Sequence, residues 1–172
     1  CYYYDETNQI TIGLVSGTQR MHHIRYLKDM LQTLYNAICM EKHDLPIHAS
    51  MLQVHANNTK KGLVFAGESG TGKSELLDAC LRTCEQKGLL AAPVYDDHGT
   101  LHYLDEEIVS TGGEIGALKN ITHSCITSVF STFSDSIFLT QENQELYQIL
   151  PLTQPMQTLQ FHKVTHLFYL DN

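Results

Sequence analysis

Eight consecutive residues, Gly67 to Ser74, have the types and the spacing that phosphate chemistry requires. They read Gly-Glu-Ser-Gly-Thr-Gly-Lys-Ser and fit G-x-x-x-x-G-K-[ST], the Walker A pattern of a loop whose backbone N–H groups surround a phosphate. In such a P-loop Lys73 reaches the outer phosphates, Ser74 offers its hydroxyl to Mg²⁺, and the glycines permit torsions that side chains prevent. We therefore predict a nucleotide site made of Gly67, Glu68, Ser69, Gly70, Thr71, Gly72, Lys73, Ser74 and Glu75.

The segments on either side of this loop have the character that phosphate binding needs. Residues 62–66 form an apolar run typical of a buried strand. From Glu75 to Cys84 apolar residues recur at helical spacing, and Gly88 follows as a helix stop. A strand, a glycine loop and a helix in this order point a helix N-terminus at an anion, which favours a phosphate loop over a chance match in a turn.

Two adjacent carboxylates, Asp96 and Asp97, follow the apolar run of residues 89–95. In an open sheet the strand ends gather at the edge that carries the phosphate loop. We expect one carboxylate to hold Mg²⁺ and the other to take a proton from an acceptor hydroxyl. We assign Asp96 to the metal and Asp97 to the base, with the two roles exchangeable; the alternative is a solvated turn.

Three further kinds of residue are candidates for the same chemistry. His48 begins a predicted strand, where it is either a packed histidine or an imidazole that orients Asp97 as part of the catalytic group. Glu114 follows a Gly-Gly pair and is a candidate third metal ligand, with Glu106 and Glu107 as competitors. Lys73 joins Asp97 and His48 in the predicted catalytic set.

Zinc is a less favoured interpretation of the remaining cysteines and histidines. Three pairs have the spacing i, i+4: Cys80 and Cys84, His98 and His102, His162 and His166. The cysteines are better explained as the buried face of the helix after the loop. The histidines fall in predicted turns or strands, where this spacing does not bring two side chains together.

Composition limits the classes of partner. The chain has 172 residues, 42% of them hydrophobic and 17% charged, and a net charge of −8, which argues against nucleic acid. No apolar run approaches the roughly 20 residues of a membrane span, and no signal peptide is evident. The odd number of scattered cysteines suits reduced thiols, so we expect a cytoplasmic protein with no membrane partner. Since the sequence starts at Cys1 without Met, we also expect a fragment of a longer chain.

The pattern of apolar residues predicts one α/β domain over residues 1–172, with N-terminal strands and a helix in residues 1–45 and the loop-bearing core in residues 46–172. We expect a helix over residues 21–40 and a hairpin made by the strands 47–55 and 62–66. The other expected elements are strands at 9–15, 89–95, 101–104 and 164–170, strands or apolar segments at 125–130 and 136–139, a loop at 111–113 and a helix at 141–150.

Three stretches together resemble the nucleotide-binding core of HPr kinase/phosphorylase and, more distantly, of phosphoenolpyruvate carboxykinase. They are Pro46-Ile47-His48-Ala49-Ser50, the run Gly67 to Glu75, and Tyr95-Asp96-Asp97. The resemblance covers about residues 45–100. It implies a P-loop on a strongly twisted mixed sheet flanked by helices, the cofactors ATP and Mg²⁺, and an aspartate that activates a serine hydroxyl beside a histidine. Carried over, the functional residues would be Lys73, Ser74, Asp96, Asp97 and His48.

The sequence departs from that family downstream of the loop. HPr kinases carry a signature of the type Leu-Glu-Ile-Arg-Gly-Leu-Gly, whereas this chain has Glu114-Ile115-Gly116-Ala117-Leu118-Lys119. The Glu-Ile pair is kept and the arginine is lacking, and Lys119 can supply a point charge but not a bidentate clamp. The chain also ends before the C-terminal helix that engages the protein substrate in that family. Nucleotide binding is therefore better supported than transfer to HPr.

Our main hypothesis is an ATP- and Mg²⁺-dependent phosphotransferase that phosphorylates a protein serine or a small-molecule hydroxyl. The first alternative is a catalytically inactive, nucleotide-binding regulatory domain, in which the missing arginine reflects lost transfer. The second is an assembly module that keeps the fold and binds little. The sequence leaves open the acceptor and assembly into a homo-oligomer.

Overall fold

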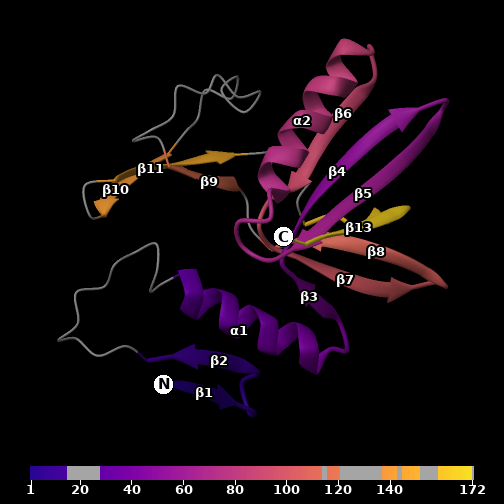
Figure 1. Cartoon of the computed structure of the whole chain (residues 1–172). Coiled ribbons are helices and arrows are strands. Elements are labelled where there is room, and N and C mark those ends of the chain that lie inside the picture. The colour runs from indigo at the N-terminus through magenta and orange to yellow at the C-terminus, as the bar shows by residue number, and fades with distance from the viewer. Residues whose placement is uncertain (15–27, 114–115, 121–136, 143–144, 152–158, 172) are drawn as a thin grey trace. The chain divides into compact units, whose positions relative to one another are not determined.

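The computed structural model describes residues 1–14, 28–113, 116–120, 137–142, 145–151 and 159–171. These residues form a mixed α/β structure with several sheets and two helices (Figure 1). The chain divides into two compact units, Cys1–His43 and Asp44–Asn172. Neither helix of the described chain combines the length and the apolar character that a membrane crossing requires.

The first unit contains a hairpin and a helix. Strands β1 (Tyr2–Asp5) and β2 (Ile10–Gly13) pair antiparallel, and α1 (Lys28–Glu41) contacts β2, where Met30 lies against Gly13. The structure confirms the described part of the helix expected over residues 21–40, whereas residues 21–27 lie outside the described chain. Among the residues of α1, only Cys39 is buried.

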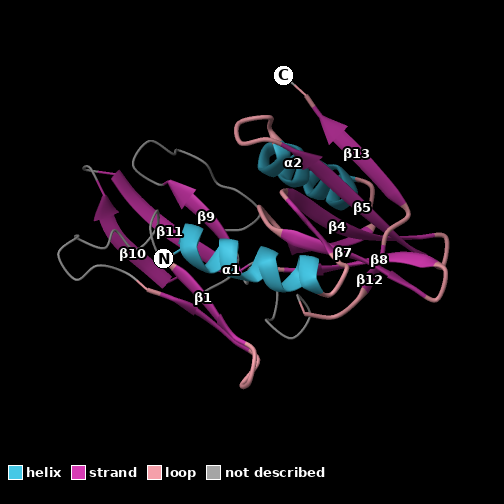
Figure 2. Ribbon diagram, turned by 90° about the horizontal axis from the view of Figure 1, so that it is seen from below, coloured by secondary structure: helices cyan, strands magenta, loops and turns pink. Residues whose placement is uncertain are grey.

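The main sheet of the second unit has the order β13-β5-β4-β6. Its strands are β4 (Ala49–Ala56), β5 (Thr59–Gly67), β6 (Leu90–Tyr95) and β13 (His166–Leu170). β13 pairs parallel with β5, and the other two pairings are antiparallel, so the sheet is mixed. The predicted hairpin of residues 47–55 and 62–66 is confirmed as β4 and β5. Helix α2 (Lys73–Gln86) packs on one face (Figure 2).

The helix stop at Gly88 is also confirmed. α2 ends at Gln86, and Gly88 takes a left-handed φ of +66°. This turn lets the N–H of Leu89 donate to the Cys84 carbonyl at 2.8 Å, which satisfies a carbonyl of the last helical turn. β6 begins directly afterwards at Leu90.

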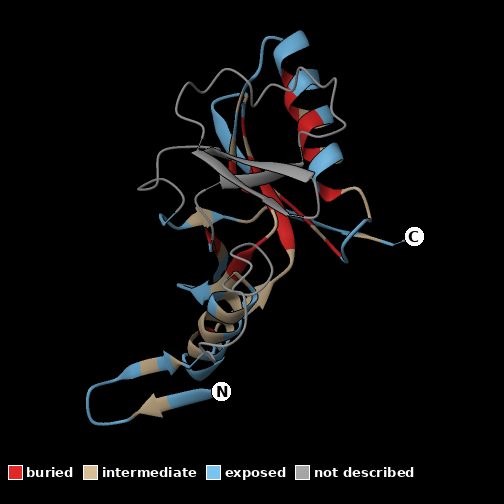
Figure 3. Cartoon of the chain, turned by 90° about the vertical axis from the view of Figure 1, so that its left-hand side faces the viewer, coloured by how far each residue is buried: buried red, intermediate tan, exposed pale blue. Residues whose placement is uncertain are grey.

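The main sheet carries an apolar core on each face because side chains alternate along β4. Figure 3 shows that buried residues lie along the strands of this sheet and along α2. Leu52 and Val54 pack with Leu77 and Leu81 of α2, whereas Met51 faces the other side with Tyr95. Burying a Leu or Met side chain completely contributes about 1.5–3 kcal/mol. The alternation therefore fixes which face α2 covers, and with it the position of the loop that precedes α2.

A second sheet has the order β12-β8-β7-β3, all antiparallel. Its strands are β3 (Leu45–Ile47), β7 (Gly99–Leu104), β8 (Glu107–Gly112) and β12 (His162–Lys163). The prediction of a loop at residues 111–113 is wrong for Thr111 and Gly112, which are the last two residues of β8. Their partners on β7 explain the difference, because Thr111 pairs with Thr100 and Gly112 with Gly99, whose lack of a side chain leaves room for the Tyr95 ring.

A third sheet contains β9 (Gly116–Asn120), β10 (Ile137–Glu142) and β11 (Glu145–Pro151), in the order β10-β11-β9. The helix predicted over residues 141–150 is therefore wrong. β11 pairs antiparallel with a strand on each side, and these two sets of backbone hydrogen bonds outweigh the weak helical preference of the segment. The predicted segment 136–139 is a strand from Ile137 onward, and segment 125–130 lies outside the described residues.

Candidate functional site

The topology of the main sheet brings the predicted site residues to one edge. β5 and β6 run in the same direction because each is antiparallel to β4, which lies between them. The loop after β5, the residues after β6 and the residues before β4 therefore meet where Ala49 pairs with Ala66 and Met51 pairs with Tyr95. His48, the loop from residue 67, and the Asp96–Asp97 pair are all at this edge.

The loop between β5 and α2 has the backbone that its glycines predict. Gly70 and Gly72 adopt left-handed φ angles of +85° and +87°, and Gly72 is the N-cap of α2. Thr71 closes the turn, since its backbone N–H donates to the Glu68 carbonyl at 3.3 Å and its hydroxyl donates to the same oxygen at 2.9 Å. At Gly67 a Cβ atom would lie 2.7 Å from the Leu170 carbonyl oxygen. The loop thus begins against β13 and ends on the N-terminus of a helix.

Lys73 lies folded against its own loop. Its side chain is buried, with 6% exposed, and Nζ donates a hydrogen bond of 2.6 Å to the Glu68 carbonyl. Burial lowers the pKa of Lys73, while Asp97, Asp96 and Glu75 act in the opposite direction because their negative charges favour the ammonium. The amine is therefore both close to the carboxylates and partly stripped of water, which strengthens its attraction for an anion.

Asp96 connects the loop helix to β4. Its Oδ1 accepts a hydrogen bond of 3.1 Å from the Ser74 hydroxyl and one of 2.5 Å from the Ser50 hydroxyl. Asp96 is 5% exposed and Ser50 is fully buried. A buried carboxylate that contacts the hydroxyl of the loop serine offers two oxygen ligands of the kind Mg²⁺ prefers.

Asp97 has a different environment from its neighbour. Its Oδ1 lies 2.7 Å from His48 Nε2, and the two side chains are 38% and 37% exposed. Asp97 adopts a left-handed φ of +84°, which turns the chain sharply between β6 and β7. The two adjacent aspartates thus differ in access: Asp96 is enclosed by hydroxyl groups, and Asp97 is open to a molecule from solution.

The remaining predicted candidates are less closely tied to this edge. Glu75 is exposed in the first turn of α2, and Glu114 lies outside the described residues. Glu107 forms an ion pair with Lys163 on the second sheet, and Glu106 lies in the turn before it. Cys84 is buried in the core beneath α2, with Cys80 packed against it. In the described part of the chain, no three His, Cys, Asp or Glu side chains converge to hold a metal.

The sequence did not predict a role at this edge for two residues that lie there, Ser50 and Asp171. Ser50 reads as one more position of a buried strand, and only its spacing of two from His48 hints that both belong to one group. Asp171 follows β13, whose Leu170 pairs with Gly67, so a further acidic residue lies at the edge that carries the loop. The sequence shows an acidic residue directly after an apolar run, which could have marked Asp171 as a candidate. It does not show that β13 pairs parallel with β5, which is what places Asp171 beside the loop.

Comparisons with known proteins do not assign the chain to a family. No model of a protein family matches the chain, and a search of curated proteins finds no significant similarity. The function proposed below therefore depends on the sequence motifs and on the geometry of the loop, Lys73 and the two aspartates.

Proposed function

We propose that this chain is an ATP- and Mg²⁺-dependent phosphotransferase of the HPr-kinase-like type. The observation that carries the proposal is the contact between the Ser74 hydroxyl and Asp96 Oδ1 at 3.1 Å, beside a loop that also holds the Lys73 amine. A chance match to the glycine pattern would give no reason for a buried carboxylate to face the serine that follows the lysine.

The loop supplies the groups that a triphosphate needs. The first backbone N–H groups of α2 have no partner within the helix, and they are directed at the loop. The Lys73 amine exchanges its contact with the Glu68 carbonyl for phosphate oxygens, which gains a charge-assisted hydrogen bond. Binding of the nucleotide is thus the first role of Gly67 to Ser74.

The residues present also fit a magnesium ion. The Ser74 hydroxyl and the Asp96 carboxylate would hold it, directly or through water. A set of three protein ligands is not required, because Mg²⁺ keeps several water molecules and binds phosphate oxygens as well. When bound, the ion neutralises charge on the phosphates. Ser50 keeps Asp96 oriented toward this position through its own hydrogen bond.

The accessible aspartate is the better candidate for the base. Asp97 takes the proton from an acceptor hydroxyl, and His48 holds the carboxylate in position through the 2.7 Å contact. Asp96 is too enclosed for this role and is assigned to the metal. The acceptor is a protein serine or a small-molecule hydroxyl, and transfer proceeds mainly through positioning and charge neutralisation.

The proposal extends to the finer fold. A P-loop between β5 and α2, a mixed main sheet and acids at the end of β6 agree with a fold of the HPr kinase and phosphoenolpyruvate carboxykinase type. In this assignment the nucleotide binds at the loop, and the acceptor approaches from the side of the exposed Asp97.

Calorimetric titration with ATP, with and without Mg²⁺, tests nucleotide binding. We expect binding that Mg²⁺ strengthens, and we expect Lys73→Ala to weaken it at least about tenfold through the lost charge-assisted contact. Lys61→Ala is the matched control, because Lys61 is an exposed lysine of β5 outside the loop. An absence of binding by the parent protein would leave only the assembly-module alternative.

Phosphate release from ATP and transfer to hydroxyl acceptors test catalysis. Asp97→Asn suits this test because Asn also tolerates a left-handed φ and removes only the charge. We expect this variant to bind ATP like the parent and to react at least about a hundredfold more slowly. Binding without any turnover in the parent would instead favour the regulatory domain, and equal rates in parent and variant would refute Asp97 as the base.

A further inference from the structure

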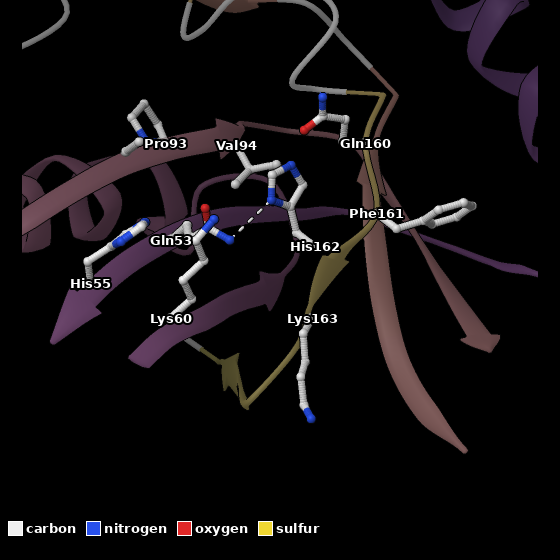
Figure 4. Close-up of a pocket in the computed structure, with 10 residues that line it drawn as sticks. Gln53, His55, Lys60, Pro93, Val94, Gln160, Phe161, His162 and Lys163 are labelled. Atoms are coloured by element: carbon white, nitrogen blue, oxygen red, sulfur yellow. Dashed lines mark hydrogen bonds between the residues drawn. The ribbon is translucent and has the colours of Figure 1, made fainter. Parts of the chain in front are cut away.

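A pocket of about 490 Å³ lies on the face of the main sheet opposite α2, and residues of β4, β5, β6 and β12 line it (Figure 4). Its position follows from strand alternation: Leu52 and Val54 face α2, so Gln53 and His55 face away from it. The residues of the pocket that matter here are Gln53, His55, Lys60, Ala92, Val94 and His162. Its volume is in the range of small-molecule sites.

The pocket is remote from the phosphate loop along the same strands. His55 pairs with Lys60 near the turn of the β4–β5 hairpin, whereas Ser50, at the loop edge, pairs with Phe65. Five residues of extended strand separate Ser50 from His55, which corresponds to about 17 Å. A group bound in the pocket is therefore too far from the loop to be the phosphate tail that the loop is proposed to hold.

The lining of the pocket favours negative charge. None of the described residues that line it is Asp or Glu, although the whole chain has a net charge of −8. Lys60 brings a positive charge, and His55 brings an imidazole on the neighbouring strand. Lys163 also lines the pocket, but it pairs with Glu107 and points away from the other side chains in Figure 4. Among the described lining residues, Lys60 is therefore the lysine whose positive charge can contact an anion in the pocket.

One polar contact and an apolar wall complete the pocket. Gln53 Nε2 lies 3.2 Å from His162 Nδ1, a contact that joins β4 to β12 across the pocket (Figure 4). With the amide as donor, Nδ1 is the acceptor and a neutral His162 carries its proton on Nε2. Ala92, which pairs with Gln53, and Val94, both of β6, supply the apolar surface. A few polar groups that converge beside apolar surface are typical of small-molecule sites.

We propose that this pocket binds a small organic anion, whose carboxylate or phosphate contacts Lys60 and His55 and whose apolar body lies against Ala92 and Val94. This site is separate from the proposed nucleotide site and needs no catalytic activity. Because both the charged head and the apolar body contribute to affinity, we expect inorganic phosphate alone and an uncharged aromatic compound alone to bind more weakly than a molecule that has both parts.

Titration followed by NMR tests the proposal, with phenyl phosphate and benzoate as probes and inorganic phosphate and uncharged benzamide as comparisons. The experiment uses Lys73→Ala protein, so that binding of a phosphate at the loop is suppressed and failure of the nucleotide proposal does not affect the result. We expect phenyl phosphate or benzoate to shift the ring protons of His55 and His162 and the methyl signals of Val94 saturably. Benzamide and inorganic phosphate should bind at least about tenfold more weakly.

Two lysine variants decide where the anion binds. Lys60→Gln should weaken binding of the anionic probe about tenfold, the loss of one charge-assisted contact. Lys61→Gln makes the same change in charge on the next residue of β5, whose partner Val54 faces α2, and should leave the affinity unchanged. No saturable shift with either anionic probe, equal affinity for benzamide, or equal losses in the two variants would overturn the proposal.

Discussion

His48 Nε2 lies 2.7 Å from Asp97 Oδ1, although 49 positions separate the two residues in the sequence. The contact forms because the chain enters β4 and leaves β6 at the same edge of the main sheet. Since both side chains remain more than one-third exposed, the pair is accessible from solution. In the proposed function this makes His48 a positioning residue for the base.

His48→Ala should therefore affect the chemical step more than nucleotide binding. We expect kcat to fall about tenfold or more, because a displaced base loses its alignment with the acceptor, while KM for ATP changes less than about twofold. His48→Gln should recover most of the rate, since its amide can donate to Asp97. Steady-state kinetics of the three proteins check this, and a rise in KM with unchanged kcat would contradict it.

At Gly62 two segments of backbone lie in close contact. We therefore expect a methyl group at this position to lower the stability of the fold strongly. A Cβ there would lie 2.1 Å from the carbonyl oxygen of Lys163, a backbone atom that Thr165 holds close through its hydrogen bonds to Gly62. We expect Gly62→Ala to lower the free energy of unfolding by about 3 kcal/mol. Urea denaturation measures this, with Lys61→Ala, an exposed neighbour, expected to change it by less than about 0.5 kcal/mol.

The sequence predicted the elements that depend on local pattern. The apolar run before Gly67, the helical spacing from Glu75 to Cys84 and the turn between β4 and β5 each carry their signal within a few residues. The prediction failed where neighbours in space decide. Gln141–Leu150 lacks a strong preference of its own, and pairing with strands on both sides makes its described residues strands.

The same distinction applies to the candidate site. Asp96 and Asp97 were predictable because acids at a strand end are visible beside an apolar run, and the gathering of strand ends is a general rule. Ser50 and Asp171 were not, since their places depend on which strands are neighbours and in which direction β13 runs. Order and direction of strands are set by long-range packing, which one sequence does not reveal.

Tyr95 joins the two sheets of the core, and its hydroxyl should contribute measurably to stability. Its ring is fully buried, and its oxygen lies 2.8 Å from the Ser110 hydroxyl, which donates to the Thr100 carbonyl. Tyr95→Phe keeps the ring and removes this link, so we expect a loss of about 1 kcal/mol. Thermal and urea unfolding measure it. The control Tyr103→Phe, at a residue 73% exposed, should be neutral, and equal effects would show that the buried link contributes nothing.

Lys73 should lower the stability of the protein, because its ammonium group is buried in the folded chain and has lost hydrating water. Its side chain is 6% exposed, and burial lowers its pKa. Lys73→Met keeps much of the volume and removes the charge, so we expect the free energy of unfolding at pH 7 to rise by about 1 kcal/mol, while the proposed ATP binding weakens at least about tenfold. Urea denaturation without nucleotide measures the change, and a less stable variant would contradict it.

The gain from Lys73→Met should also depend on pH in a defined direction. Because burial places the pKa of Lys73 in the folded protein below that in the unfolded chain, the unfolded chain binds more protons between these two values. The stability of the parent therefore rises with pH in this interval, relative to a variant that lacks the group. The difference between the two proteins should be greatest at and below the low-pH end of this interval and should shrink toward about pH 10, near the ordinary lysine pKa. Paired urea titrations at several pH values measure it, and a difference that grows with pH would show that the neighbouring carboxylates, rather than burial, dominate at Lys73.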